Sequence, residues 1–469
     1  MKLKSNKCIL IVTYAVVVLF VLMIVWIGYL DIVGRKNIEN NSYNKRVDSW
    51  AENVVRGSIY SADGNILAQT VTDENGTEKR VYPYDNLFSH VIGYNSNGKS
   101  GLELKMNYYL LTSNDNELVQ AVNQLSNQKS TGFDVITTLD TRIGEVASAT
   151  LGNNKGAVVV LDASTGEVLC EISKPDFNPN TIEEEWSSII EDSDNSPLLN
   201  RATAGQYPPG STFKLVTLLE YIIENESYDD FSYNCTGSIN YNGSQMSCIY
   251  HSAHGNVNLS RAFAYSCNCS FATIGIELDM TRYKLLCDKL MFNTDLFTDF
   301  ECKKSSFYLD ENSTDFDIMQ TAIGQGKTLM TPMHNAMIMS AVANDGVLVK
   351  PHTVAKVVDK NGREKMKFEL ESKTLLTSQE SEILKKYLRD VVTFGTATNL
   401  NNKPYTAYGK TGSAQFDDSN PNLFHSWFTG FAEIGDRNIV VCAVVESTYD
   451  GGNTGKAIAQ KVFDCIAQQ

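Results

Sequence analysis

The sequence predicts a mixed α+β protein, in which one membrane-spanning helix and a mostly β region precede a larger domain of sheet and helices. Three observations favour this fold class. An uncharged apolar run lies near the N-terminus, short strand-like segments and turns follow it, and further strand-like segments occur both before and after a helical middle. Strands from both ends of a domain are expected to meet in one sheet when helices lie between them. The expected parts are residues 1–7, 8–30, 31–133 and 134–469.

The first predicted element is the apolar run over residues 8–30, which contains no charged side chain. A helix of this length can cross a bilayer. Lys2, Lys4 and Lys7 precede the run, so we expect a cytoplasmic N-terminal tail and an extracytoplasmic remainder of the chain. A cleaved signal peptide would have a shorter apolar core that ends in small residues, whereas this run ends in Trp-Ile-Gly-Tyr-Leu. We therefore expect a single-pass membrane anchor.

The composition is that of a globular protein with a large core. The chain has 469 residues, of which 42% are hydrophobic and 20% are charged. Its net charge is −15, whereas a nucleic-acid-binding protein would carry a basic patch, so no nucleic-acid partner is expected. The residue patterns indicate no cofactor.

Ten cysteines in an extracytoplasmic chain raise the question of disulfides. Cys235 and Cys248 bracket a short polar loop and are the first candidates for a pair. Cys267 and Cys269 are two positions apart, which is not the spacing of zinc ligands. We expect free buried thiols at most of the positions and no metal site.

The next region, residues 31–133, is predicted to be a non-catalytic spacer or docking domain. Residues 31–53 are polar and rich in asparagine, as expected of a tether above a membrane. Residues 56–68 predict a β-hairpin with Asp63-Gly64 in its turn. Short strand-like pieces and turns follow, without a catalytic cluster.

The larger domain is expected to begin with a strand over 134–140 and a helix that ends near residue 151. Two antiparallel strands over 156–162 and 166–172 follow, and then an acidic, solvated helix and loop. The later expected elements are helices over 215–224, 259–278 and 332–344, strands over 425–434 and 438–446, and a final helix from about residue 456. Thr331 and Pro332 are suited to cap and begin their helix.

The strongest chemical signal is a serine at the start of a predicted helix. Tyr-Pro-Pro-Gly at 207–210 excludes helix before Ser211, and an apolar run follows Lys214. Ser211 would then lie near free backbone N–H groups, with Lys214 one turn further on the same face. A lysine among apolar neighbours loses its proton more easily than one in water. The pattern predicts an activated serine nucleophile, although Ser-x-x-Lys also occurs in three polar segments without a helix start.

Two further patterns occur later in the chain. Ser266 and Asn268 lie inside an apolar stretch, where polar side chains need a partner. A predicted strand then carries Lys-Thr-Gly-Ser at 410–413. Other Ser-x-Asn and Lys-Ser-Gly matches either precede Ser211 or lie in polar loops.

Ser-x-x-Lys, Ser-x-Asn and Lys-Thr-Gly in this order are the signature of the penicillin-binding protein and serine β-lactamase superfamily. The surrounding sequence resembles the class B, monofunctional transpeptidases. Matching segments lie at 56–68, 90–94, 101–103, 199–202, 206–210, 323–326, 331–332 and 427–432, and so span nearly all the chain outside the first 50 residues. The resemblance implies a transpeptidase domain with a central antiparallel sheet flanked by helices, behind a transmembrane helix and a mostly β pedestal domain (residues 31–133).

The resemblance also implies catalytic roles. Ser211 would attack the carbonyl of the penultimate D-Ala of a peptidoglycan stem peptide and release the terminal D-Ala. Lys214 would take the serine proton, although the identity of the base is disputed in related enzymes. Ser266 would relay a proton toward the leaving group. Asn268 would hold Lys214 and the donor peptide.

Substrate binding is assigned by resemblance to the predicted strand. Lys410 would supply a positive field, and the hydroxyls of Thr411 and Ser413 would bind the terminal carboxylate of the donor. Gly412 has no side chain and would leave room for substrate beside the strand. The backbone N–H groups of Ser211 and Ser413 would form the oxyanion hole.

Several alternatives stay open at this point. A D,D-carboxypeptidase would use water in place of a neighbouring stem amine, whereas a non-catalytic scaffold should have lost Ser211 or Lys214. A β-lactamase would be a smaller single domain, and a β-lactam sensor would need a larger cytoplasmic part. A bifunctional enzyme would need a glycosyltransferase domain before residue 134. The resemblance implies β-lactams as inhibitors. It also implies a SEDS-family glycosyltransferase in the membrane as the partner that polymerises the glycan.

Overall fold

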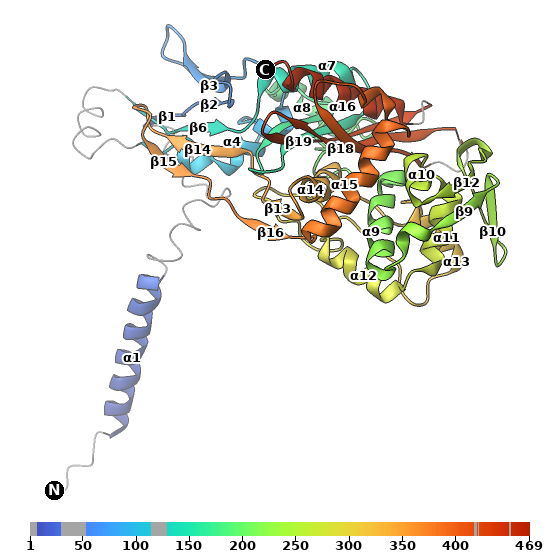
Figure 1. The fold of residues 1–469 in the computed structure, drawn as a ribbon. Coiled ribbons are helices and arrows are strands. Elements are labelled where there is room, and N and C mark those ends of the chain that lie inside the picture. The colour runs from blue at the N-terminus through green and yellow to red at the C-terminus, as the bar shows by residue number, and fades with distance from the viewer. Residues whose placement is uncertain (1–6, 30–52, 114–128, 417–419, 421, 450–451) are drawn as a thin grey trace.

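The computed structural model describes residues 7–29, 53–113, 129–416, 420, 422–449 and 452–469 (Figure 1). Helix α1 (Lys7–Tyr29) covers the predicted membrane span except residue 30, which lies outside the described residues. Its apolar side chains are exposed from Ile9 onward. Among the described helices, α1 alone is long and apolar enough to cross a membrane.

A five-stranded antiparallel sheet forms the centre of the larger domain, which confirms the predicted fold class. Its strand order is β17-β18-β19-β7-β8. The strands are β7 (Gly156–Asp162), β8 (Val168–Lys174), β17 (Thr406–Gln415), β18 (Phe424–Ile434) and β19 (Arg437–Thr448). Strands from both ends of the domain pair directly, because Ile439 to Val445 of β19 run alongside β7.

Helices cover both faces of this sheet (Figure 1). Helices α7 (Thr141–Leu151) and α16 (Asn453–Ile466) pack against each other and against the sheet. Helix α14 (Pro332–Ala343) contacts β7, β18 and β19. All its side chains are buried, and Thr331 caps it by accepting from the backbone N–H of His334, as predicted.

A second sheet of six strands joins segments that are far apart in the sequence. Its order is β15-β14-β6-β2-β3-β4. The strands are β2 (Ile59–Tyr60), β3 (Ile66–Thr72), β4 (Glu78–Val81), β6 (Asp134–Thr137), β14 (Val354–Val358) and β15 (Glu364–Lys367). The predicted hairpin is confirmed as β2 and β3. The boundary predicted at residue 133 lies within this sheet, because β6, β14 and β15 come from later in the chain.

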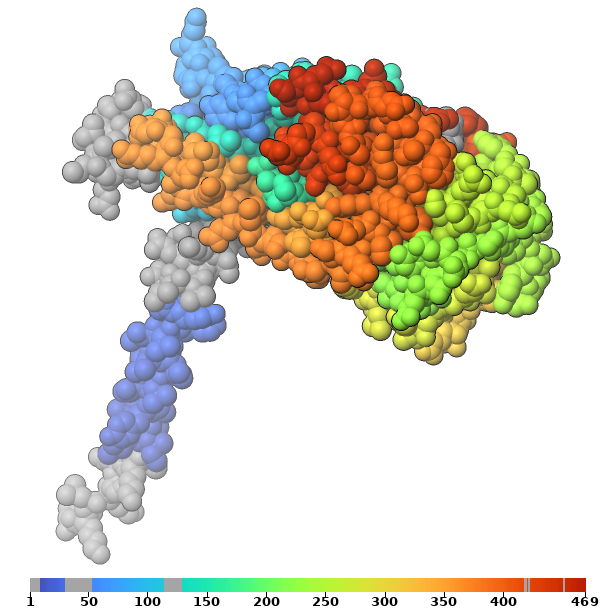
Figure 2. All heavy atoms as spheres, viewed as in Figure 1, coloured from blue at the N-terminus to red at the C-terminus, as the bar shows by residue number. Residues whose placement is uncertain are grey.

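Within the part that the structure describes, the N-terminal region also contains three short helices, α3 (Ser89–Ile92), α4 (Gly101–Lys105) and α5 (Asn107–Leu110). In the space-filling view, residues near β14 and β15 lie beside this region, and residues of about 230–330 gather at the other end of the molecule (Figure 2).

The segment 259–278 was predicted as a single helix, and this is wrong. It forms α10 (Leu259–Ala264) and α11 (Asn268–Glu277), with a break between them. Ser266 has φ +58°, a left-handed backbone conformation that a helix cannot accommodate. After this residue a new helix begins, and Cys267 Sγ caps it by accepting from the backbone N–H of Ser270.

The remaining described elements are α8 (Ile182–Glu191), η3 (Gly210–Thr212), α9 (Lys214–Glu224), η4 (Tyr228–Asp230), η5 (Ile249–His251), α12 (Met280–Lys289), α13 (Asp315–Ala322), α15 (Ser378–Thr393) and η6 (Thr398–Leu400). Four two-stranded sheets are formed by β1 (Val54–Val55) with β5 (Ser130–Thr131), β9 (Ser232–Cys235) with β12 (Gly255–Asn258), β10 (Ser238–Tyr241) with β11 (Ser244–Ser247), and β13 (Val347–Val349) with β16 (Ser372–Thr374).

Candidate active site

Ser211 lies in the one-turn helix η3, directly before α9, and is 6% exposed. The preceding Gly210 has φ +54°, a conformation that favours glycine, and its N–H donates to the carbonyl of Gly324 at 2.8 Å. Thr212 donates to the carbonyl of Pro209 and accepts from the side-chain amide of Asn335 on α14. Backbone and side-chain hydrogen bonds therefore fix the turn that presents Ser211.

Strand β17 packs closely against this turn, and Gly412 makes the approach possible. A Cβ at position 412 would lie 3.0 Å from Trp427 Cβ, 3.1 Å from Thr212 Cγ2 and 3.2 Å from the carbonyl oxygen of Pro209. The space that the glycine leaves is thus filled by the protein. Its absent side chain serves the packing of β17 on η3, and the predicted clearance for substrate stays a prediction.

Lys214 is completely buried at the start of α9 and binds the break between α10 and α11. Its Nζ donates to the backbone carbonyl of Ser266 at 2.7 Å, to Ser266 Oγ at 3.2 Å and to Asn268 Oδ1 at 2.7 Å. The hydrogen bonds described for this ammonium do not include one to Ser211, which lies one turn earlier. The predicted contact between Asn268 and Lys214 is present.

Lys410, on β17, also contacts Ser266. It is also completely buried, and its Nζ donates to Ser266 Oγ at 2.9 Å and to the carbonyl of Thr411 at 3.0 Å. Ser266 Oγ therefore accepts from two lysines, which occupies both its lone pairs. Its own proton is left to be donated to a third group.

Burial shifts the proton affinity of both lysines. Removal from water lowers the pKa of Lys214 to about 8, and the thiols of Cys267, Cys248 and Cys269 act in the opposite direction. Burial, and then the positive charge of Lys214, lowers the pKa of Lys410 well below its usual range. Two ammonium groups on one hydroxyl favour loss of a proton from the pair, so the site can accept a proton near neutral pH.

Thr411 and Ser413 lie on the outer strand of the five-stranded sheet. Among the described strands, β17 pairs with β18 alone, so no described strand covers its other edge. The hydroxyl of Thr411 is 2.6 Å from that of Thr396, a contact that the sequence did not indicate. Ser413 is half-buried.

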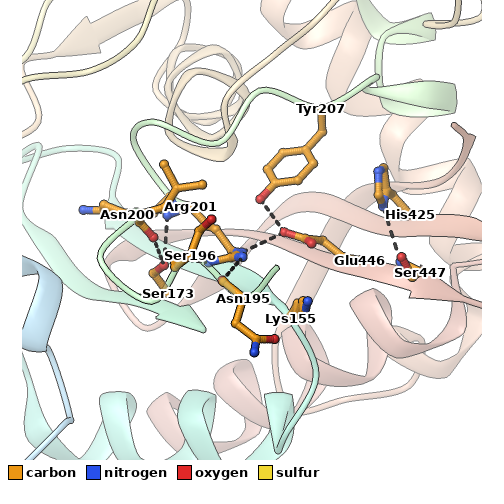
Figure 3. Close-up of polar contacts among 12 residues, drawn as sticks. Lys155, Ser173, Asn195, Ser196, Asn200, Arg201, Tyr207, His425, Glu446 and Ser447 are labelled. Atoms are coloured by element: carbon orange, nitrogen blue, oxygen red, sulfur yellow. Dashed lines mark hydrogen bonds and ion pairs between the residues drawn. The ribbon is translucent and has the colours of Figure 1, made fainter. Parts of the chain in front are cut away.

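A second polar network supports the segment that leads to Ser211, and Figure 3 shows Glu446 between Arg201 and Tyr207. Glu446 Oε1 accepts from Arg201 Nε and from the Tyr207 hydroxyl, both at 2.8 Å. Arg201 also donates to the carbonyls of Asn195 and Ser196. No role was predicted for Glu446 from the sequence. It is a single carboxylate at the end of an apolar strand, where it needs a partner, and this position could have indicated its role.

Cys235 and Cys248, the first candidates for a disulfide, are free thiols, the state predicted for most of the cysteines. The Sγ atoms of Cys235 and Cys248 are 3.7 Å apart, and every cysteine side chain that the structure describes is a free thiol. Both thiols lie in a group with His254 and Cys267, whose ligand atoms are all within 4.8 Å of one another. These four residues could hold a metal ion. They come from separate segments, so spacing along the sequence did not reveal them.

Comparison with known proteins identifies the family of the chain. Residues 156–468, more than half of the chain, match the penicillin-binding protein transpeptidase domain, and residues 56–135 match the penicillin-binding protein A dimerisation domain. The chain is similar to the D,D-transpeptidase domain of a peptidoglycan glycosyltransferase from Eggerthella lenta, with 28% identity, a TM-score of 0.79, and coverage of 88% of this chain and 98% of that one. The ceftriaxone acyl-enzyme of penicillin-binding protein A from M. tuberculosis shares the fold, with a TM-score of 0.80 at 24% identity over 90% of this chain and all of the other.

Curated relatives of the chain include proteins named peptidoglycan D,D-transpeptidase. MrdA of Acinetobacter baumannii is 27% identical over 82% of this chain, and the match spans 65% of MrdA, less than two thirds of its length. PbpA of Mycolicibacterium smegmatis is 26% identical over 96% of both chains. With the family match over most of the chain and the same fold in solved members, this chain belongs to the penicillin-binding protein transpeptidase family.

Proposed function

We propose that this chain is a serine D,D-transpeptidase of peptidoglycan synthesis that β-lactams inhibit, with Ser211 as its nucleophile. The observation that carries the proposal is the convergence of Lys214 and Lys410 on Ser266 Oγ, with Lys214 one helical turn after Ser211. The names of the relatives and the acyl-enzyme of a family member support the same chemistry.

In the proposed reaction, Ser211 Oγ attacks the carbonyl carbon between the two D-Ala residues, and Lys214 Nζ takes its proton. The bond to the leaving D-Ala nitrogen then breaks, and that nitrogen receives a proton through Ser266 Oγ. The amine of a neighbouring stem peptide attacks the resulting ester and releases Ser211. The role of Ser266 follows from its two lysine contacts, because they leave its proton free to be transferred.

We place the proposed substrate groove along the edge of β17 that pairs with no described strand. The donor peptide would lie along this edge, with its terminal carboxylate on the hydroxyls of Thr411 and Ser413 and with Asn268 on its backbone. The Asn268 amide nitrogen already donates to the carbonyl of Ser247, which orients the side chain. The N–H groups of Ser211 and Ser413 would bind the oxyanion, an interaction that contributes about 3 kcal/mol per donor.

Covalent labelling of the full-length chain in detergent with a fluorescent penicillin tests the nucleophile. We expect one stable adduct per chain in the wild type and none in Ser211→Ala. Ser96→Ala is the matched control, because Ser96 forms the same Ser-x-x-Lys pattern with Lys99 on the N-terminal region and should leave labelling unchanged. Labelling of Ser211→Ala would overturn the assignment, and absence of labelling in the folded wild type would favour a non-catalytic scaffold.

A stem-peptide assay then separates transpeptidase from carboxypeptidase. We expect the acyl-enzyme to transfer to an added amine acceptor in preference to water. Release of D-Ala that is insensitive to the acceptor would identify a carboxypeptidase.

For the membrane region, we propose that α1 anchors the chain with its N-terminus in the cytoplasm. Lys2, Lys4 and Lys7 precede the apolar run, as expected for the inner side of a membrane. The proposed partner is a SEDS-family glycosyltransferase, contacted by the exposed apolar surface of α1 and by the N-terminal region. Replacement of α1 by an unrelated membrane helix should abolish co-purification with that partner while penicillin labelling persists.

A further inference from the structure

Four potential metal ligands come together beside the active site. We call them the thiol–imidazole cluster: Cys235, Cys248, His254 and Cys267. Cys235 ends β9, Cys248 follows β11, His254 precedes β12, and Cys267 lies in the break between α10 and α11. The three cysteines are buried and the histidine is half-buried. Elements β9, β12 and α11, which carry or adjoin the cluster, lie at the end of the molecule away from the N-terminal region (Figure 1).

Three separations in the cluster match those of ligands around one tetrahedral ion, and all its ligand atoms lie within 4.8 Å of one another. The Sγ atom of Cys248 is 3.7 Å from that of Cys235 and 3.8 Å from that of Cys267. Two thiolates on one Zn²⁺, each bonded at about 2.3 Å, are separated by about 3.8 Å at the tetrahedral angle. A disulfide would instead require about 2.05 Å between sulfurs.

The imidazole fits the same geometry. Cys235 Sγ lies 3.5 Å from His254 Nδ1. A sulfur at about 2.3 Å and a nitrogen at about 2.1 Å from one tetrahedral ion are about 3.6 Å apart. Three soft thiolates and one imidazole form a closed Cys₃His set, which is characteristic of structural zinc.

The position of Cys267 connects this cluster to the reaction site. Cys267 lies between Ser266 and Asn268, the two residues that accept from Lys214. Asn268 also donates to the carbonyl of Ser247, which precedes the ligand Cys248. The left-handed backbone of Ser266 stores strain that its surroundings must stabilise. A link from Cys267 to three other segments would supply that stabilisation.

We propose that the thiol–imidazole cluster binds one structural Zn²⁺ ion, and that this ion fixes the segment that carries Ser266 and Asn268. The binding of the ion is independent of the proposed function, whereas its effect on acylation rests on that function. The ion is a cross-link between β9, β11, the start of β12 and α11 rather than a participant in the reaction.

Metal content of the purified full-length chain is the first test. We expect one zinc per chain by elemental mass spectrometry, and a chain loaded with Co²⁺ should show the thiolate charge-transfer and visible bands of a tetrahedral cobalt site. Cys235→Ser should lose zinc to a chelator at least tenfold faster than the wild type. Cys287→Ser is the matched control, because Cys287 is an equally buried thiol on α12, outside the cluster, and should retain zinc.

Two substitutions at His254 keep the test decisive if a buried cysteine variant fails to fold. His254→Cys retains a ligand and should bind zinc, whereas His254→Ala should not. Cys269→Ser examines a further thiol, 3.5 Å from Cys248 at Sγ, and should retain the metal. Loss of zinc in Cys269→Ser would overturn the ligand assignment. A folded wild-type chain without zinc, or with a Cys235–Cys248 disulfide by peptide mass spectrometry, would overturn the site.

The effect on the reaction site is measured separately. Removal of zinc from the wild type should slow penicillin acylation at least tenfold, and added zinc should restore the rate. Zinc binding with an unchanged rate after its removal would refute the fixing role. Failure of the proposed function is distinguishable, because a chain that binds zinc but is not acylated at all contradicts only that function.

Discussion

Ser266, Cys267 and Asn268 lie between two buried polar environments of opposite character. On one side, Lys214 and Lys410 contact Ser266 through hydrogen bonds that leave a proton available for transfer. On the other side, Cys267 contacts thiols that come within ligand distance of one another. The first environment has to change its protonation during a reaction, whereas the second requires only a fixed geometry. A segment whose groups exchange protons thus adjoins a cluster that only has to keep its geometry.

The largest expected effect comes from the environment that contains Lys214 and Lys410, the lysine side of the segment Ser266–Asn268. Lys214→Ala removes the proposed base and should lower the rate of penicillin acylation by about 10³–10⁴-fold. Zinc content should not change, because Lys214 contacts Ser266 and Asn268 but none of the cluster's side chains among the described hydrogen bonds. Stopped-flow labelling and elemental analysis of the same sample measure both quantities.

Lys214→Arg tests whether Lys214 acts as a proton acceptor or only through its positive charge. Arginine keeps the positive charge but does not lose its proton in proteins, so it should be nearly as slow as the alanine variant. An arginine variant with close to the wild-type rate would show that Lys214 acts only through its charge.

The pH dependence of acylation tests whether neutral Lys214 accepts the proton of Ser211. Burial lowers the pKa of Lys214 to about 8, so the neutral, proton-accepting form increases as the pH rises through that value. The groups around it are Lys410 from β17 and the thiols of Cys248, Cys267 and Cys269. We expect the acylation rate to rise about tenfold between pH 7 and pH 9. A rate that falls over this interval would contradict a neutral lysine base.

Most of the lysine side could be predicted from the sequence, because each of its residues belongs to a short motif. Ser211 and Lys214 are one helical turn apart, and Lys410 to Ser413 are consecutive on one strand. The relative positions of these residues depend only on the local helix or strand and not on how the rest of the chain folds. The large strands and helices were predictable for the same reason, from periodicity and from caps such as Thr331.

The thiol–imidazole cluster could not be predicted, because its four residues lie in separate segments of the sequence. Cys235 and His254 meet only because β9 and β12 pair antiparallel, a register that no spacing along the chain determines. The break at Ser266 was also missed, since the residues around it are apolar enough for an unbroken helix. The contribution of β14 to the six-stranded sheet is another pairing between distant segments.

A smaller effect should follow from Gly412→Ala, which tests why the motif contains glycine. The new Cβ would approach Trp427, Thr212 and Pro209 within 3.0–3.2 Å. Overpacking of this kind costs about 1–3 kcal/mol, so the midpoint of thermal unfolding should fall. Weaker penicillin binding with an unchanged midpoint would instead support clearance for the ligand. Ser413→Ala, on the same strand, is the control and should not lower the midpoint.

The smallest effect concerns the hydroxyl pair of Thr396 and Thr411. Their Oγ1 atoms are 2.6 Å apart, so Thr396 orients the hydroxyl that we propose binds the donor's carboxylate. Thr396→Val should weaken this interaction by about 1 kcal/mol, which is roughly a fivefold lower acylation rate at limiting penicillin. The rate at saturating penicillin should change little, because Thr396 contacts none of the groups that transfer protons. Thr393→Val, with its hydroxyl on the carbonyl of Arg389, is the matched control. Equal effects at both positions would mean that Thr396 acts on the packing of α15, and the hydroxyl of Thr411 would then need no partner to bind a carboxylate.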